Sequence, residues 1–163
     1  MLRILTLAAG LSGAAGLSQF PEFSQQYLQR LSGAVDELRG MAVAFDVTAK
    51  MRGLSREEAL AQLEGTAFKE DLRDTMGATL ARYDRLQADY DTMKAQSVVQ
   101  RLSTPWNFAD SELAQRTWDT FKPALPLTVD GAICAAVGFV SGWAIMAAFL
   151  SLLLWPVRRL LAA

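Results

Sequence analysis

Residues 131–155 read GAICAAVGFVSGWAIMAAFLSLLLW and contain no charged side chain. A bilayer core needs about 20 such residues in helical form, so this stretch is long enough to cross it. A soluble helix of this length normally keeps a polar face, which is missing here. Trp155, Arg158 and Arg159 follow, and an aromatic ring beside snorkelling cations is typical of a membrane boundary. We therefore expect a C-terminal transmembrane helix within residues 128–156 and a short basic tail at 157–163.

A second apolar stretch lies near the N-terminal end. Residues 4–20 read ILTLAAGLSGAAGLSQF and follow Arg3. Their number is close to the minimum for a transmembrane helix. A cation followed by a short apolar run also fits a secretory signal peptide. We favour an uncleaved transmembrane helix at residues 1–20 and keep the signal peptide as the alternative.

Nearly all the charged residues lie between these two stretches, in residues 21–127. After Pro21, which suits the first turn of a helix, apolar residues step by three and four in a heptad seam. Ser55 and Glu58 have the spacing of a capping box that opens a short helix. A second amphipathic helix is predicted from about Thr66 to Leu102. The members of the seam are Leu28, Leu31, Val35, Leu38, Ala42, Phe45 and Ala49, and those of the second stripe are Phe68, Leu72, Met76, Tyr83, Leu86, Tyr90 and Met93.

The two amphipathic helices predict the fold class. Short connections favour antiparallel neighbours, so we expect a long helical hairpin outside the membrane, with coiled-coil packing between its arms. The predicted fold is thus an all-α membrane protein in which two terminal transmembrane helices flank this hairpin domain.

A short amphipathic helix is predicted at about residues 107–122, with Asn107 or Asp110 as its cap. Its aromatic face includes Trp118. This face suits lipid headgroups, and it equally suits the core of the extramembrane domain. We treat Trp106 and Trp118, with Trp155, Arg158 and Arg159, as candidate membrane-interface residues.

Small residues recur on one face of each apolar stretch. Gly138 and Gly142 form a GxxxG pattern, and small residues let helix backbones approach closely in lipid. We expect these faces to pack against another helix, within one protomer or between protomers. The candidate helix-packing residues are Gly10, Gly13, Gly16, Cys134, Gly138 and Gly142.

Composition argues against several classes of function. The 163 residues carry a net charge of −1 without a basic tract interleaved with aromatics, so we expect no nucleic-acid partner. Histidine is absent and cysteine occurs once, which removes the usual ligand sets for zinc, haem or iron–sulfur clusters. Adjacent acidic pairs point about 100° apart on a helix, and no phosphate loop or nucleophile motif occurs. We expect neither an enzyme nor a bound cofactor.

Two segments resemble a known bacterial family. They are SQFPEFSQQYLQRLSGAVDELRG at residues 18–40 and FKPALPLTVDG at residues 121–131, each beside a glycine-rich apolar stretch. They are similar to an uncharacterised proteobacterial family of inner-membrane proteins. The resemblance extends to Gly142 and implies two spans in the inner membrane, without an activity or functional residues.

The arginines near the two ends predict the orientation. Arg3 and the pair Arg158–Arg159 flank the apolar stretches, so both termini are expected in the cytoplasm and the middle domain in the periplasm. We expect a non-enzymatic membrane scaffold or accessory subunit, with membrane lipid and either itself or a larger membrane complex as partners. The alternative is a small oligomeric pore or transport component, for which Thr6, Ser12, Ser141 and Asp130 are the polar candidates.

Overall fold

The computed structural model describes residues 2–124 and 127–161, with side chains as far as Leu154. Every element in this part of the chain is helical, which confirms the predicted all-α class. The chain divides into two compact units: Met1–Gln26, Val98–Trp106 and Gln115–Ala163 form the first, and Tyr27–Ser97 and Asn107–Ala114 form the second. The elements are α1 (Leu2–Leu17), α2 (Phe20–Met51), α3 (Arg56–Ala61), α4 (Ala67–Ala95), α5 (Val98–Leu102), the 3₁₀ helix η1 (Pro105–Phe108), α6 (Ser111–Asp119) and α7 (Val129–Leu161).

Helix α7 carries the apolar stretch that dominates the sequence. Among the described residues, its segment Val129–Leu154 is the one stretch long and apolar enough to cross a membrane. Thr128 precedes the helix, and its hydroxyl accepts the Gly131 N–H at 3.1 Å, as a capping residue does. The predicted C-terminal apolar helix is therefore confirmed as a candidate membrane span. The helix continues to Leu161, beyond the predicted end of the span.

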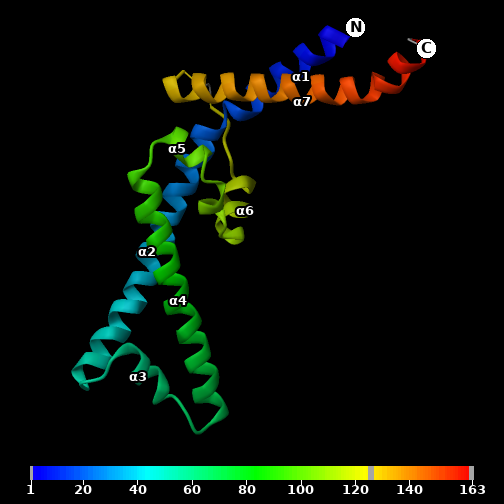
Figure 1. Ribbon diagram of the computed structural model, residues 1–163. Coiled ribbons are helices and arrows are strands. Elements are labelled where there is room, and N and C mark those ends of the chain that lie inside the picture. Colours follow the sequence, from blue (N-terminus) through cyan, green and yellow to red (C-terminus); the bar gives the residue numbers. More distant parts are fainter. Residues whose placement is uncertain (1, 125–126, 162–163) are drawn as a thin grey trace. The chain divides into compact units, whose positions relative to one another are not determined.

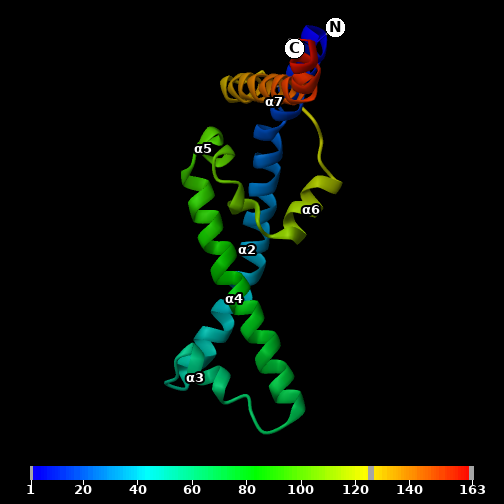
Figure 2. The same ribbon diagram turned by 45° about the vertical axis from the view of Figure 1, so that its right-hand side comes forward.

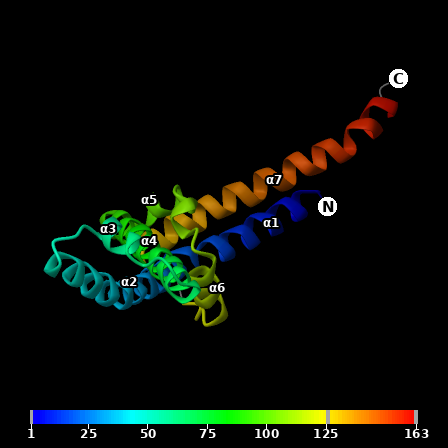
Figure 3. The same ribbon diagram turned by 90° about the horizontal axis from the view of Figure 1, so that it is seen from below.

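In the first unit, α1 lies antiparallel beside α7, and the N-terminal end of α1 is on the side toward which α7 runs (Figures 1 and 3). α1 ends at Leu17, short of the predicted residue 20. The Ser18 hydroxyl donates to the Ala15 carbonyl at 2.8 Å, and a new helix begins at Phe20. Pro21 lies in the first turn of α2, where its missing N–H leaves no hydrogen bond unmade.

The second unit has a core of side chains from α2, α4 and α6. Its buried members are Tyr27, Leu31, Val35, Leu86, Met93 and Leu113. The Tyr27 and Phe108 rings also meet, with centroids 4.8 Å apart. Ala42 and Ala49 of the predicted seam are buried further along α2. The core therefore uses one face of α2, as the spacing by three and four predicted.

The connection between α2 and α4 follows the predicted turn chemistry. Gly53, with φ 71°, ends α2 in the left-handed region that favours glycine. The capping box is confirmed, because Ser55 accepts the Glu58 N–H and the Glu58 carboxylate accepts the Ser55 N–H. Thr66 caps α4, because its hydroxyl accepts the Lys69 N–H.

The single helix predicted from Thr66 to Leu102 is wrong. α4 ends at Ala95 because Gln96 adopts an extended conformation, and a separate short helix, α5, follows. Figures 1 and 2 show α2 and α4 crossing and then separating toward the end where α3 lies. Phe68 and Leu72 lie near that separated end of α4, where their side chains are 76% and 38% exposed. These two members of the predicted apolar face of α4 are therefore not part of the core.

The helix predicted at 107–122 is shorter than expected. Asp110 is its cap, since its carboxylate accepts the Leu113 N–H at 3.0 Å. Asn107 lies instead in the preceding 3₁₀ turn, η1. The helix α6 begins at Ser111 and ends at Asp119, before the predicted end at residue 122.

Candidate functional site

The candidate site is the line of contact between α1 and α7, where glycines let the two backbones approach closely. A Cβ added to Gly138 would overlap the Gly13 carbonyl group and lie 2.8 Å from the Leu17 Cβ. A Cβ added to Gly13 would overlap the Gly138 carbonyl oxygen. One at Gly142 would overlap the Ala9 carbonyl oxygen. The atoms in the way belong mainly to the backbone, which cannot turn aside as a flexible side chain can.

The other small residues predicted to pack have different surroundings. A Cβ on Gly10 would lie 2.8 Å from the Phe139 ring, so its neighbour is a side chain. A Cβ on Gly16 would meet nothing within 4 Å. Cys134 is fully buried on α7, one turn before Gly138. The structure thus brings Gly13, Gly138 and Gly142 together and leaves Gly16 at an open position.

The outward faces of this helix pair are apolar. Leu11 on α1 and Ile145 on α7 are 58% and 70% exposed. Soluble monomers rarely expose apolar patches of more than a few hundred Å², and larger ones mark protein or membrane contacts. Further exposed apolar side chains of the pair are Ile4, Leu7, Val137, Val140, Phe149, Leu152 and Leu153.

Two of the predicted membrane-interface residues are described with their side chains. Trp106 lies in η1 and Trp118 in α6, and both are largely exposed. The Trp118 ring stacks on Phe121 with centroids 6.3 Å apart and an interplanar angle of 9°. Side chains beyond Leu154, including those of Trp155, Arg158 and Arg159, lie outside the described residues.

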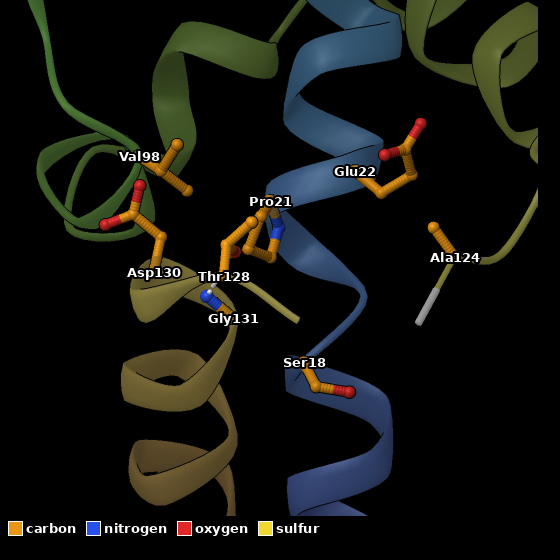
Figure 4. Close-up of a pocket in the computed structure, with 8 residues that line it drawn as sticks. All are labelled: Ser18, Pro21, Glu22, Val98, Ala124, Thr128, Asp130 and Gly131. Atoms are coloured by element: carbon orange, nitrogen blue, oxygen red, sulfur yellow. Dashed lines mark hydrogen bonds between the residues drawn. The ribbon is translucent and has the colours of Figure 1, made fainter. Parts of the chain in front are cut away.

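A cavity of about 230 Å³ lies where the ends of α1 and α7 meet (Figure 4). Its lining includes Ser18 after α1, Glu22 at the start of α2, and Thr128 and Asp130 at the start of α7. Figure 4 shows the Glu22 and Asp130 carboxylates pointing in different directions, so they do not converge on one point. Converging polar groups are what a metal or a catalytic site requires. Within residues 2–124 and 127–161, no group of three or more His, Cys, Asp or Glu residues is placed to hold a metal ion.

A buried arginine joins α5 to the start of α2. Arg101 of α5 is 7% exposed, and its guanidinium donates to the Ser24 hydroxyl at 3.2 Å. Burial lowers the pKa of Arg101. A charged side chain in such a position holds α5 against the start of α2 through a directional hydrogen bond.

The charged residues of the second unit form ion pairs between helices. Arg56 of α3 binds the Asp46 carboxylate with two hydrogen bonds of 2.7 and 2.6 Å and also binds Asp84 at 2.9 Å. The hydrogen bonds from Arg56 lower the pKa of Asp46. Burial, together with the negative charges of Asp110 and Asp89, raises the pKa of Tyr27 to about 12. The Arg56 ion pairs connect α3 to α2 and to α4.

Sequence reasoning named the small residues but missed the larger side chains that complete the contact. Phe139 covers Gly10, and Leu150 is buried further along α7. Leu150 follows the steps of four that run from Cys134 through Gly138 and Gly142, and Phe139 lies three residues before Gly142. In an all-apolar helix this spacing does not stand out, because the residues facing lipid are apolar as well.

Comparison with known proteins gives a family but no activity. Residues 1–159 match the family model described as "Protein of unknown function (DUF2937)". No curated protein and no solved structure matches the chain. The predicted membership of an uncharacterised family is confirmed by a match that covers almost the whole chain. The chain belongs to the DUF2937 family.

Proposed function

We propose that this protein is an integral membrane scaffold or accessory subunit that crosses the bilayer twice, through α1 and α7. It acts by helix–helix association, with itself or with a larger membrane complex, and catalyses no reaction. The observation that carries the proposal is the backbone contact at Gly13 and Gly138, on a helix pair whose other faces are apolar. Close approach of glycines is a recurrent way of holding helices together in lipid.

The second span rests on the pairing of α1 with α7. At about 1.5 Å per residue, the 16 residues of α1 cover about 24 Å, less than the roughly 30 Å of a bilayer core. Pairing with α7 supports insertion of this short helix, since the Leu17 side chain at the end of α1 lies beside Gly138 of α7. We infer that α1 enters the membrane as half of a helical pair.

For the rest of the chain we infer a helical hairpin outside the membrane, with coiled-coil contacts between α2 and α4. The shared core of Tyr27, Leu31, Leu86 and Met93 supports it. The arginines at positions 3, 158 and 159 favour cytoplasmic termini and a periplasmic hairpin in the bacterial inner membrane.

The orientation is tested with a single introduced cysteine. Cys134 is first replaced by alanine, and exposed Glu57 on α3 is then changed to cysteine. We expect a membrane-impermeant maleimide to label Glu57→Cys in intact spheroplasts. Labelling only after lysis would reverse the topology and put the hairpin in the cytoplasm.

The mode of action is tested with the purified full chain in lipid nanodiscs and in liposomes. We expect native mass spectrometry to find more than one chain per particle or a stoichiometric membrane partner, and we expect no ion flux across the liposomes. A single chain without a stoichiometric partner, together with flux above that of empty liposomes, would refute the scaffold and favour the pore.

A further inference from the structure

An apolar groove lies at the junction of α1 and α2, beside the end of α6. We call it the aromatic groove; its apolar lining consists of Gly16, Leu17, Phe20, Phe23, Trp118 and Phe121, and its volume is about 210 Å³. Gln19 adds a polar edge, but its amide group already bonds the Ser18 hydroxyl and the Ala124 N–H. What enters this groove must therefore be mainly hydrocarbon.

Three of the four rings that line the groove, those of Phe23, Trp118 and Phe121, form an aromatic wall. Trp118 and Phe121 are stacked, and each meets Phe23 edge to face, with centroids 6.4 and 6.0 Å apart. Such ring pairs contribute beyond their buried area, so they hold one another in place. Even so, Trp118 is 72% exposed. The rings thus hold one another in place, but the outer face of Trp118 is exposed in the single chain.

The position of the groove identifies what covers it. Ser18, the residue after Leu17, lines the same cavity as Thr128 and Asp130 at the start of α7. The groove is thus level with the ends of both apolar helices, where a bilayer core would stop. Tryptophan is enriched at that level because its ring is amphipathic. α1 also carries exposed apolar side chains, among them that of Leu11.

We propose that the aromatic groove binds the acyl chain of a bilayer phospholipid near its glycerol end. The proposal rests on the membrane spans inferred above. Gly16 lines this site, and a Cβ there would meet nothing within 4 Å, so the space beside it is open. The groove thereby fixes the depth at which α6 meets the membrane.

Brominated lipids test the proposal, because bromine quenches tryptophan fluorescence at short range. The sequence has four tryptophans: Trp106, Trp118, Trp143 and Trp155. Two full-length variants, with phenylalanine at the other three positions, keep either Trp118 or Trp143 alone. Each is placed in phosphatidylcholine bilayers that carry bromine near the glycerol end or near the middle of the acyl chain.

We expect glycerol-end bromine to quench Trp118 about two-fold more strongly than mid-chain bromine, and we expect the reverse order for Trp143. Trp143 lies within α7, so its lack of quenching would refute the membrane span itself. Normal quenching of Trp143 without quenching of Trp118 would overturn the groove alone. That second result is also expected if another copy of this chain covers the ring instead of lipid.

Filling the groove separates occupancy from simple exposure to lipid. We expect Gly16→Leu to reduce the quenching of Trp118 by about half, since the new side chain takes space left by the glycine. Ala15→Leu adds the same kind of bulk at an exposed neighbouring position outside the groove and is expected to change nothing. Equal quenching in the two variants would show that Trp118 faces lipid without a bound chain, and would overturn the site.

Discussion

The α1–α7 pair and the core of the second unit both join long helices, but they use different means. α1 and α7 meet backbone to backbone at Gly13 and Gly138, and their remaining faces are apolar. In the second unit, large side chains such as Leu86 and Met93 fill the space between helices, and Arg56 adds ion pairs to Asp46 and Asp84. Burial of apolar surface drives packing in water, whereas lipid provides no such drive and leaves close contact as the main source of attraction. In the proposed membrane arrangement, the first unit faces lipid and the second faces water. Added volume should therefore damage the first unit, and removed volume should damage the second.

The largest effect is expected from removing volume in the second unit. Leu86 is fully buried in its core, so Leu86→Ala should lower the free energy of unfolding by about 2–5 kcal/mol. Urea unfolding of the full chain in mild detergent, followed by circular dichroism, measures this loss. Leu72→Ala is the matched control on the same helix. The Leu72 side chain is 38% exposed, so this variant should lower the free energy of unfolding by about 1 kcal/mol or less. Equal losses in the two variants would contradict the assigned core.

Adding volume should instead break the first unit. Gly138→Ile places a branched side chain against the Gly13 backbone, and overpacking of this kind costs about 1–3 kcal/mol. Cys134, the single cysteine and fully buried, reports the opening of the pair. We expect maleimide to label Cys134 about ten-fold to a hundred-fold faster in this variant.

The controls for that experiment come from both units. Gly16→Ile makes the same substitution at an open position of α1 and should leave the labelling rate of Cys134 unchanged. Leu86→Ala should leave it unchanged too, because the cavity forms in the other unit. Faster labelling in all three variants would mean that the two units unfold together.

The smallest effect is expected at the ion pairs of Arg56, whose groups are partly exposed. Arg56→Gln should lower the free energy of unfolding by about 0.2–1 kcal/mol at neutral pH. The folded pKa of Asp46 is lowered by Arg56, so this stabilisation is fully present above the unfolded carboxyl value of about 4. It is lost as the pH falls through the folded value of Asp46.

Urea titrations of wild type and Arg56→Gln at neutral and acidic pH measure that loss. The difference in the free energy of unfolding between wild type and Arg56→Gln should vanish at acidic pH. Arg73→Gln is the control, because Glu64 and Asp74 are more exposed partners and a smaller difference is expected at every pH. A difference for Arg56→Gln that persists in acid would assign the effect to packing of the side-chain stem instead of charge.

Much of the helical pattern could be predicted because it depends on local chemistry. The capping box at Ser55 and Glu58 and the end of α2 at Gly53 involve residues within one turn, and the structure has both. The break at Gln96 could not be predicted in this way. Nothing in the local sequence forbids a helix there, and the break allows Arg101 to reach Ser24, far away along the chain.

The candidate site was partly predictable for a related reason. Gly138 and Gly142 are spaced by one turn, so the sequence alone puts them on one face of a helix. Which helix they face depends on a long-range contact, and the structure gives Gly13 and Ala9 as the neighbours. The aromatic groove could not be predicted at all, since it joins residues near position 20 to residues near position 120.

The unequal lengths of α1 and α7 have a consequence for the surrounding lipid in the proposed two-span arrangement. A 16-residue helix leaves a hydrophobic mismatch of about 6 Å against an average bilayer core, whereas Val129–Leu154 exceeds that core and can tilt. Lipid beside α1 must therefore thin locally, while lipid beside α7 need not. A protein that deforms the bilayer on one flank is expected to collect shorter or more disordered acyl chains there, and to partition into the thinner regions of its membrane.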